Sequence, residues 1–211
     1  YWQNGAVTVS QDSPSDPVLL FTPSNVTDGV FNYQGSSAKT RHTVALVKWN
    51  DPEDFFRNKI EYVEDAAGIA RYGIIQTEVT AIGCTSQGQA NRVGRWLLLS
   101  EQSESEIVAF KTGIEAANCR PGQIIAISDP VRGGTRRGGR VIAATLSTIT
   151  IDAPVTVTGS GHTISVLLPN GHVETKEIAS ITGVSITLVQ DLSTIPAAGA
   201  VWILESPNLQ S

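Results

Sequence analysis

Short runs of apolar residues in the middle of the chain predict strands. The first clear run is 43–49, in which apolar residues occupy positions that point to both faces of a strand. A strand that is apolar on both faces is typical of a sheet covered on both sides. We predict that 59–63 pairs with it and that 74–82 and 106–114 form further strands.

Two helices are predicted between these strands. Asp65 is placed to cap a short helix that Gly73 would end. Ser86 and Gln89 stand at the spacing of a capping box, which favours a helix start. Apolar residues then recur at helical spacing and would form one face of a longer helix. They are Ala90, Val93, Leu97 and Leu98.

The pattern changes at Arg120-Pro121-Gly122, after which no helical periodicity is found. Short runs rich in Val, Ile and Thr alternate with turn signals, which is typical of a small barrel or sandwich. The runs are 124–128, 140–146, 148–151, 163–168, 173–178, 185–188 and 201–204. Pro169-Asn170-Gly171 predicts a hairpin with a type I′ turn.

These patterns predict an α+β fold: a mixed sheet with one long packed helix, followed by a small all-β barrel or sandwich. We divide the chain into an irregular segment with edge strands at 1–40, an α/β domain at 41–121 and a β-barrel domain at 122–211. The turn-rich composition of the first forty residues favours the first boundary.

Composition restricts the classes of function. The chain has 211 residues, of which 41% are hydrophobic and 17% charged, and its net charge is -5. This balance argues against a dedicated nucleic-acid surface, which needs an excess of Lys and Arg. The sequence has no apolar run of the roughly 18 residues that cross a bilayer, so no membrane insertion is expected. Because the chain opens Tyr-Trp-Gln and contains no Met, we interpret it as a piece of a longer protein.

Residues that carry chemistry are few. His42, His162 and His172 stand at no zinc-ligand spacing, so no metal and no cofactor are predicted. Cys84 and Cys119 are predicted to be free thiols. Glu101, Glu104 and Glu106 cluster after the longer helix. A glycosidase needs two acids across a cleft, whereas three acids within six residues favour a solvated turn. No catalytic residue is therefore predicted.

One loop is a candidate partner contact. Gly133-Gly134-Thr135-Arg136-Arg137-Gly138-Gly139-Arg140 lacks the Gly-Lys-Ser/Thr ending of a phosphate-binding loop and only faintly resembles an Arg-Gly-Gly nucleic-acid segment. A flexible connection with solvated arginines is the simpler interpretation. If the chain contacts a partner protein or DNA here, we expect Arg136, Arg137 and Arg140 to do so, because binding loops are often mounted on rigid scaffolds.

Three long segments have a distinctive sequence: Glu64-Asp65-x-x-x-Ile69-Ala70-Arg71-Tyr72-Gly73, Gly83-Cys84-Thr85-Ser86-Gln87-Gly88-Gln89-Ala90 and Arg120-Pro121-Gly122-Gln123-Ile124-Ile125. These segments resemble the tip attachment (host-specificity) proteins of lambda-like siphophages. The resemblance continues through Gly138-Gly139-Arg140-Val141 to Val201-Trp202-x-Leu204 and spans about 24–209. The sequence departs from the family's pattern mainly in the loops 132–139 and 155–161.

The resemblance implies a structural part of a phage or prophage tail tip. The family's members are much longer trimers at the end of a non-contractile tail, with baseplate-hub-like domains around the channel through which DNA passes. It therefore implies a homotrimer in the full-length virion protein, other tail proteins as partners, DNA only as passing cargo and synthesis in the host cytoplasm. No active site is implied. Two alternatives stay open: a tail-associated cell-wall hydrolase and a receptor-binding module.

Overall fold

A computed structural model describes residues 2–3, 5–9, 13–37 and 41–207 of the chain. The fold is mostly β, with a six-stranded closed barrel and a few helices, which is compatible with the predicted α+β class. The chain forms two compact units, one made of 1–31 with 110–211 and the other of 32–109. The predicted boundaries at 40 and 121 stay a prediction.

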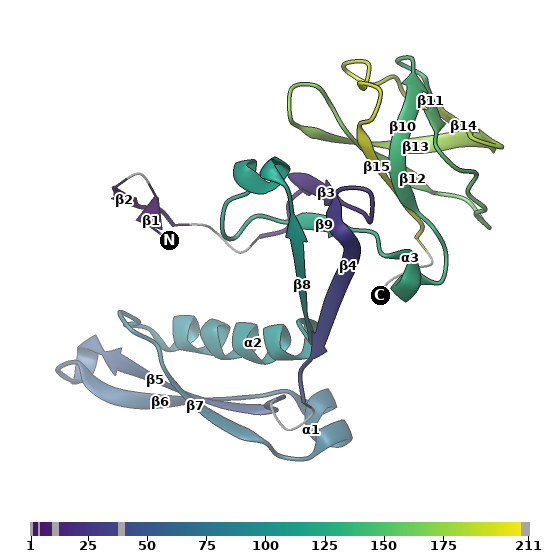
Figure 1. Ribbon diagram of the computed structural model, residues 1–211. Helices are drawn as coiled ribbons and strands as arrows, with labels where there is room; N and C mark the ends of the chain where they lie inside the picture. Colours follow the sequence, from purple (N-terminus) through teal and green to yellow (C-terminus); the bar gives the residue numbers. More distant parts are fainter. Residues whose placement is uncertain (1, 4, 10–12, 38–40, 208–211) are drawn as a thin grey trace. The chain divides into compact units, whose positions relative to one another are not determined.

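The unit 32–109 is a three-stranded mixed sheet with helices (Figure 1). Its strands and helices are β5 (Val44–Asp51), the 3-10 helix η2 (Pro52–Asp54), β6 (Arg57–Glu64), α1 (Ala66–Tyr72), β7 (Gln76–Thr80) and α2 (Gln87–Ser103). The strand order is β6-β5-β7, with β6 antiparallel and β7 parallel to β5. β5 is therefore the central strand.

Local sequence signals define both helices. The carboxylate of Asp65 accepts hydrogen bonds from the N–H groups of Ala67 and Gly68, and Gly73 ends α1 with a φ of +79°. The Ser86 hydroxyl accepts the N–H of Gln89 at 3.2 Å and caps α2. These contacts satisfy N–H groups that the first turn of a helix leaves without partners.

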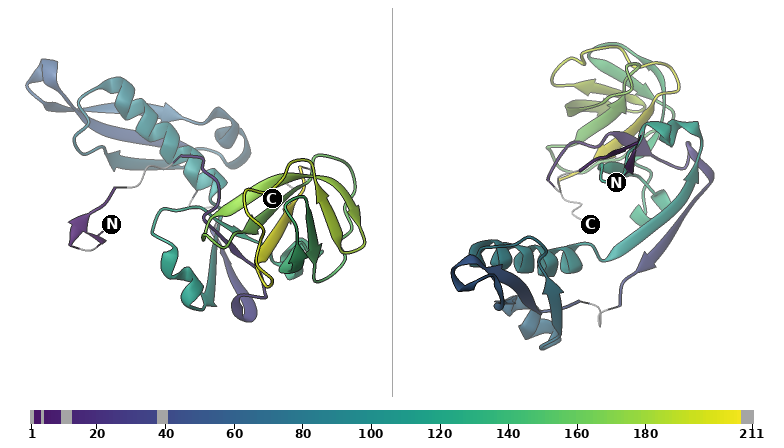
Figure 2. Two further views of the ribbon diagram at one scale, coloured as in Figure 1. Left: turned by 90° about the horizontal axis from the view of Figure 1, so that it is seen from above. Right: turned by 90° about the vertical axis from the view of Figure 1, so that its left-hand side faces the viewer.

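Helix α2 lies along one face of the sheet in each view (Figures 1 and 2). Its residues Ala90 and Leu98 pack with Ala45 and Val47 of β5 and with Val63 of β6. On the other face of β5, Lys48 is about 40% exposed and pairs with Glu78. The expectation that both faces of β5 are covered holds at Val44, which is 1% exposed on this face, but not at Lys48, whose charge needs water.

The other unit contains the closed barrel. The barrel strands are β10 (Gly138–Ala144), β11 (Thr148–Ile151), β12 (Thr163–Leu167), β13 (Val173–Thr182), β14 (Ser185–Leu188) and β15 (Val201–Glu205), in the order β10-β11-β14-β13-β12-β15. β15 pairs with both β10 and β12 and so closes the barrel. Closure removes the edge strands that an open sheet would expose.

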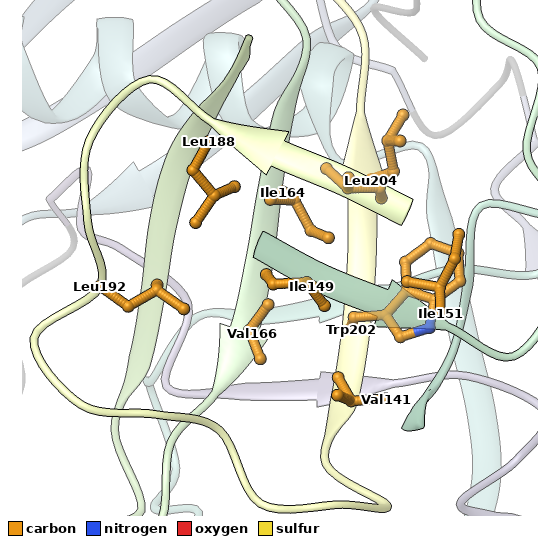
Figure 3. Packing of buried hydrophobic residues seen from close by; sticks show 10 residues of the cluster. Val141, Ile149, Ile151, Ile164, Val166, Leu188, Leu192, Trp202 and Leu204 are labelled. Atoms are coloured by element: carbon orange, nitrogen blue, oxygen red, sulfur yellow. The ribbon is translucent and has the colours of Figure 1, made fainter. Parts of the chain in front are cut away.

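The barrel core is a single apolar cluster (Figure 3). It contains Val141, Ile149, Ile151, Ile164, Val166, Ile186, Leu188, Leu192, Trp202 and Leu204. Trp202 is completely buried. On the outer side of β15, Val201 and Ile203 pack with Leu20 of β3 (Leu19–Phe21). β15 is apolar at four consecutive positions because both of its faces are covered.

Two predicted features, the place of the strand at 124–128 and the turn type at 169–171, differ from the structure. β9 (Ile125–Ile127) lies outside the barrel and pairs in parallel with β3. The hairpin at Pro169-Asn170-Gly171 joins β12 to β13, with Leu167 opposite Val173. The type I′ turn is wrong, because Gly171 has a φ of +81° whereas Asn170 does not have the positive φ that such a turn requires.

The remaining elements lie before β5 and between α2 and β10. They are β1 (Trp2–Gln3), β2 (Ala6–Val7), β4 (Val26–Gly35), β8 (Glu106–Thr112), the 3-10 helix η3 (Ile114–Asn118) and α3 (Pro130–Gly133). β1 pairs with β2, and β4 pairs with β8. The chain passes from one compact unit to the other within β4 and again within β8.

Candidate interaction surfaces

The arginine-rich loop joins α3 to β10, and intramolecular bonds hold much of it. Arg136 forms an ion pair with Asp152, and its Nε donates to the Gly138 carbonyl at 3.0 Å. Arg140 donates to the carbonyls of Gly199 at 2.8 Å and Ser24 at 3.0 Å. Arg136 and Arg140, which were predicted as partner contacts, therefore fasten the loop to the barrel.

Arg137 is bound less completely than Arg136 and Arg140. Its Nε donates to the Thr135 hydroxyl at 3.2 Å, whereas its buried Nη1 has no hydrogen-bond partner in the described part of the chain. The carbonyl of Arg137 accepts the N–H of Leu204 at 2.7 Å, which ties the backbone to the barrel's closing strand. The structure thus brings Arg136 and Arg137 to one end of the barrel.

Glycines next to these arginines permit close packing. A Cβ added at Gly138 would lie 2.7 Å from Cγ2 of Thr22, and one added at Gly139 would collide with the Asp152 carboxylate. The glycine-rich composition of the loop thus has a packing function at its β10 end. Toward α3, Gly133 and Gly134 face open space.

Glu101, the first residue of the predicted acidic cluster, contacts a histidine. Glu101 accepts a hydrogen bond from the backbone N–H of His42 at 2.9 Å and contacts Nδ1 of the same histidine at 2.8 Å. Glu104 forms the C-cap of α2, and Glu106 starts β8. His42 and Glu101 fasten the segment before β5 to the end of α2.

His162, Cys84 and Cys119 are further residues that the sequence singled out as candidates for chemistry. His162 is buried, with its Nδ1 2.6 Å from the Ser206 hydroxyl. Cys84 and Cys119 are free thiols, as predicted. Within the described ranges, no group of three or more His, Cys, Asp or Glu side chains is arranged to hold a metal ion.

The turn between β5 and β6 displays two aromatic side chains that the sequence reasoning missed. Phe55 is 88% exposed and Phe56 58% exposed. Both have a positive φ, 51° and 56°, a conformation that costs a residue other than glycine roughly 1–2 kcal/mol. The available signal was the pair of adjacent phenylalanines within the polar stretch 50–59.

Hydrogen bonds hold this aromatic tip, defined as residues 52–56, in place. The Phe56 N–H donates to the Asp51 carbonyl at 2.7 Å, and Asn50 Nδ2 donates to the Phe56 carbonyl at 3.1 Å. Asp51 also forms an ion pair with Lys59 across the hairpin. The hydrogen bond from Lys59 lowers the pKa of Asp51, and the same bond raises the pKa of Lys59.

A hollow of about 570 Å³ lies beside the aromatic tip. Trp49, Pro52 and Ile60 give it apolar walls, and Thr85 to Gln87 line it at the start of α2. Its charged lining comprises the carboxylates of Asp51, Glu53 and Glu61 and the amine of Lys59. Gln87 and Asn91 donate to Glu61 at 2.9 and 3.0 Å.

Fold and surfaces together define a class: a mostly β protein whose candidate contacts lie on exposed loops beside a barrel and a helix-covered sheet. The chain belongs to a family of putative phage tail proteins, whose model matches residues 1–143. Among the described residues, no helix is both long and apolar enough to cross a membrane.

Two curated relatives are tip attachment proteins J. The protein of Escherichia phage SECphi4 is 32% identical over 215 aligned positions, which cover 100% of this chain and 19% of the relative. That of Escherichia phage SECphi27 is 36% identical over 129 positions, 61% of this chain and 11% of the relative. The chain thus spans about a fifth or less of their length.

The solved tailspike gp61 of Pseudomonas phage phi297 is 13% identical over 42% of this chain and 16% of that structure. Its TM-score of 0.25 is too low to support an argument.

Proposed function

We propose that this chain is a structural segment of a bacteriophage or prophage tail tip that serves tail assembly and host attachment in the virion. The observation that carries the proposal is the alignment of the whole chain, at 32% identity, with a protein named for tip attachment. The match of the phage-tail family model to residues 1–143 supports it independently.

Within this function, we propose a baseplate-hub-like scaffold that forms a homotrimer in the full-length protein and contacts other tail proteins. The closed barrel, with a closing strand covered on both sides, supports a scaffold role because such a core is rigid. The net charge of -5 fits a wall that lets DNA pass without binding it. Arg136, Arg137 and Arg140 remain the proposed partner contacts of the barrel.

We also propose that this segment has no catalytic activity of its own. Glu101 is engaged with His42 rather than with a second acid, which supports this view. The alternatives are a cell-wall hydrolase and a receptor-binding module. Zymography on peptidoglycan tests the first, and saturable binding of the chain to host envelope tests the second.

In the phage or prophage that encodes the chain, in-frame deletion of its coding segment tests the function. We expect normal numbers of heads but tails that fail to assemble, as counted by electron microscopy. Where tails do assemble, we expect them to fail to adsorb, which a plaque assay would show as a loss of infectious particles. Immunogold labelling should place the chain at one end of wild-type tails. Normal, infectious tails after the deletion, or label confined to heads, would contradict the proposal.

A further inference from the structure

The outer side of α2 carries a stripe of cationic and apolar side chains. At helical spacing, Arg92, Arg95, Trp96 and Leu99 fall within about a third of the helix circumference. They lie opposite the residues of α2 that are buried against the sheet. Trp96 is 54% exposed and Leu99 66% exposed. We call these four residues the outer stripe.

The two arginines of the outer stripe are uncompensated. Within the part of the chain that the structure describes, neither Arg92 nor Arg95 forms a hydrogen bond or an ion pair. The chain as a whole is acidic, with a net charge of -5. A phosphate backbone alone does not match the outer stripe, because half of the stripe is apolar. The matching partner combines apolar side chains with a carboxylate.

The aromatic tip of the same chain has that composition. Phe55 and Phe56 are exposed, and both hold a strained backbone conformation of a kind that is concentrated at binding sites. Glu53 stands beside them, and its carboxylate has no ion pair among the described residues, whereas Asp54 pairs with Arg57 at 3.6 Å. Since hydrogen bonds hold the tip in advance, little conformational entropy is lost when a partner binds.

The aromatic tip and the outer stripe of one copy do not meet. The tip is the end of the β5–β6 hairpin and projects beyond the start of α2 (Figures 1 and 2). The outer stripe lies on the side of α2 that faces away from the sheet. Both surfaces belong to the compact unit 32–109, so their separation is fixed. Only a tip from another molecule can cover the stripe.

We propose that a second copy of this chain docks its aromatic tip on the outer stripe of α2. Phe55 and Phe56 of one copy pack on Trp96 of the other, and Glu53 pairs with the arginines of the stripe. Each copy offers one tip and one stripe, so the contact is head-to-tail, which generates a ring when its rotation closes. The inference rests on the proposed function, because it names the surfaces through which the copies in a homotrimer meet.

Analytical ultracentrifugation of the 211-residue chain tests the contact. We expect association that rises with protein concentration and weakens in high salt, because salt screens the charges of Glu53 and the two arginines. The tip variant, Phe55→Ser/Phe56→Ser, and the stripe variant, Arg92→Glu/Arg95→Glu, should each weaken association by about tenfold or more, as loss of an interface hot spot does.

Mixing the two variants tests the head-to-tail geometry. The tip variant keeps an intact stripe, and the stripe variant keeps an intact tip. An equimolar mixture should therefore form a heterodimer and nothing larger, although neither variant associates by itself. A contact between two identical surfaces would give no such recovery, because each variant would damage its own half of the contact.

Matched controls separate docking from general surface effects. Ile114→Ser removes an apolar side chain that is 90% exposed and lies outside both surfaces. Arg71→Glu/Arg120→Glu makes the same change in net charge as the stripe variant, at two exposed arginines elsewhere in the chain. Both controls should leave association unchanged. Circular dichroism should show every variant folded, because the substituted side chains are exposed.

Three results would overturn the inference: a chain that stays monomeric at all concentrations, association that either variant leaves intact, or a mixture without heterodimers. Flotation of the wild type, but not of the stripe variant, with phosphatidylglycerol vesicles would assign the outer stripe to anionic lipid and would also overturn it. The immunogold experiment is independent of these results, so the tail-tip function can stand where the contact fails.

Discussion

Trp202 donates its indole N–H to the carboxylate of Asp152 at 3.3 Å. Trp202 fills the barrel core, and Asp152 also pairs with Arg136 of the arginine-rich loop. One carboxylate therefore links the core to a candidate contact loop, and the barrel's closing strand positions that loop.

Replacement of Asp152 should destabilise the barrel. Asp152→Ala leaves the buried indole N–H without its acceptor and releases Arg136. We expect a loss of about 2 kcal/mol in the free energy of unfolding, measured by urea denaturation. Asp191→Ala, at an exposed position, is the matched control and should change little. Equal effects of the two substitutions would show that the link is not structural.

Gly94 should tolerate no larger residue. A Cβ there would lie 2.7 Å from Cγ2 of Val63 and 3.1 Å from Cγ2 of Val47. Although alanine is favoured over glycine inside a helix by about 1 kcal/mol, Gly94→Ala should destabilise the chain by about 1–3 kcal/mol through overpacking. Gly88→Ala, whose Cβ would come no nearer than 3.7 Å to Arg92, should instead be neutral or stabilising. A stabilised Gly94→Ala variant in thermal unfolding would contradict this close approach.

The Asp51–Lys59 pair should make stability depend on pH at both extremes. The pKa of Asp51 is lowered in the folded state, so its contribution is present above the unfolded-state pKa, about 4, and is lost as pH falls through the folded value. The pKa of Lys59 is raised, so its contribution is present below the unfolded-state pKa, about 10.4, and is lost as pH rises through the folded value. Asp51→Asn should flatten the acid limb in melting experiments from pH 2 to 6. Glu53→Gln is the control, and an acid limb unchanged by Asp51→Asn would disprove the assignment.

The side chain of Phe55 should lower the stability of the chain rather than raise it. Phe55→Gly relieves the positive φ and loses little burial, so the free energy of unfolding should rise by up to about 1 kcal/mol. The measurement is urea denaturation of the variant and of the wild type. Phe21→Gly is the contrasting case, because Phe21 is buried and packs on Phe110, with ring centroids 4.8 Å apart, so that it should only destabilise. A less stable Phe55→Gly variant would show that the ring supports the fold.

Local signals in the sequence were sufficient for many element boundaries. Asp65, Gly73 and Ser86 were predicted as helix caps and act as caps, because a cap bonds within one turn of its own helix. The free thiols and the closing strand at 201–204 were also predicted. The sequence pattern is typical of either a barrel or a sandwich, because alternation shows which face is buried but not which strands pair; the domain division names a barrel, and the structure has a closed barrel.

The sequence by itself determined the secondary-structure periods, the helix caps and the position of the hairpin at 169–171, though not its turn type, since these depend on neighbouring residues. Only the tertiary structure decided the parallel pairing of Leu19–Phe21 with Ile125–Ile127, the engagement of Glu101 by His42 and the link from Asp152 to Trp202. It also decided that Lys48 faces water on a strand predicted to be covered and that Phe55 and Phe56 are exposed. The physical reason is that burial and pairing depend on which distant segments pack together, and a local pattern does not specify its partner.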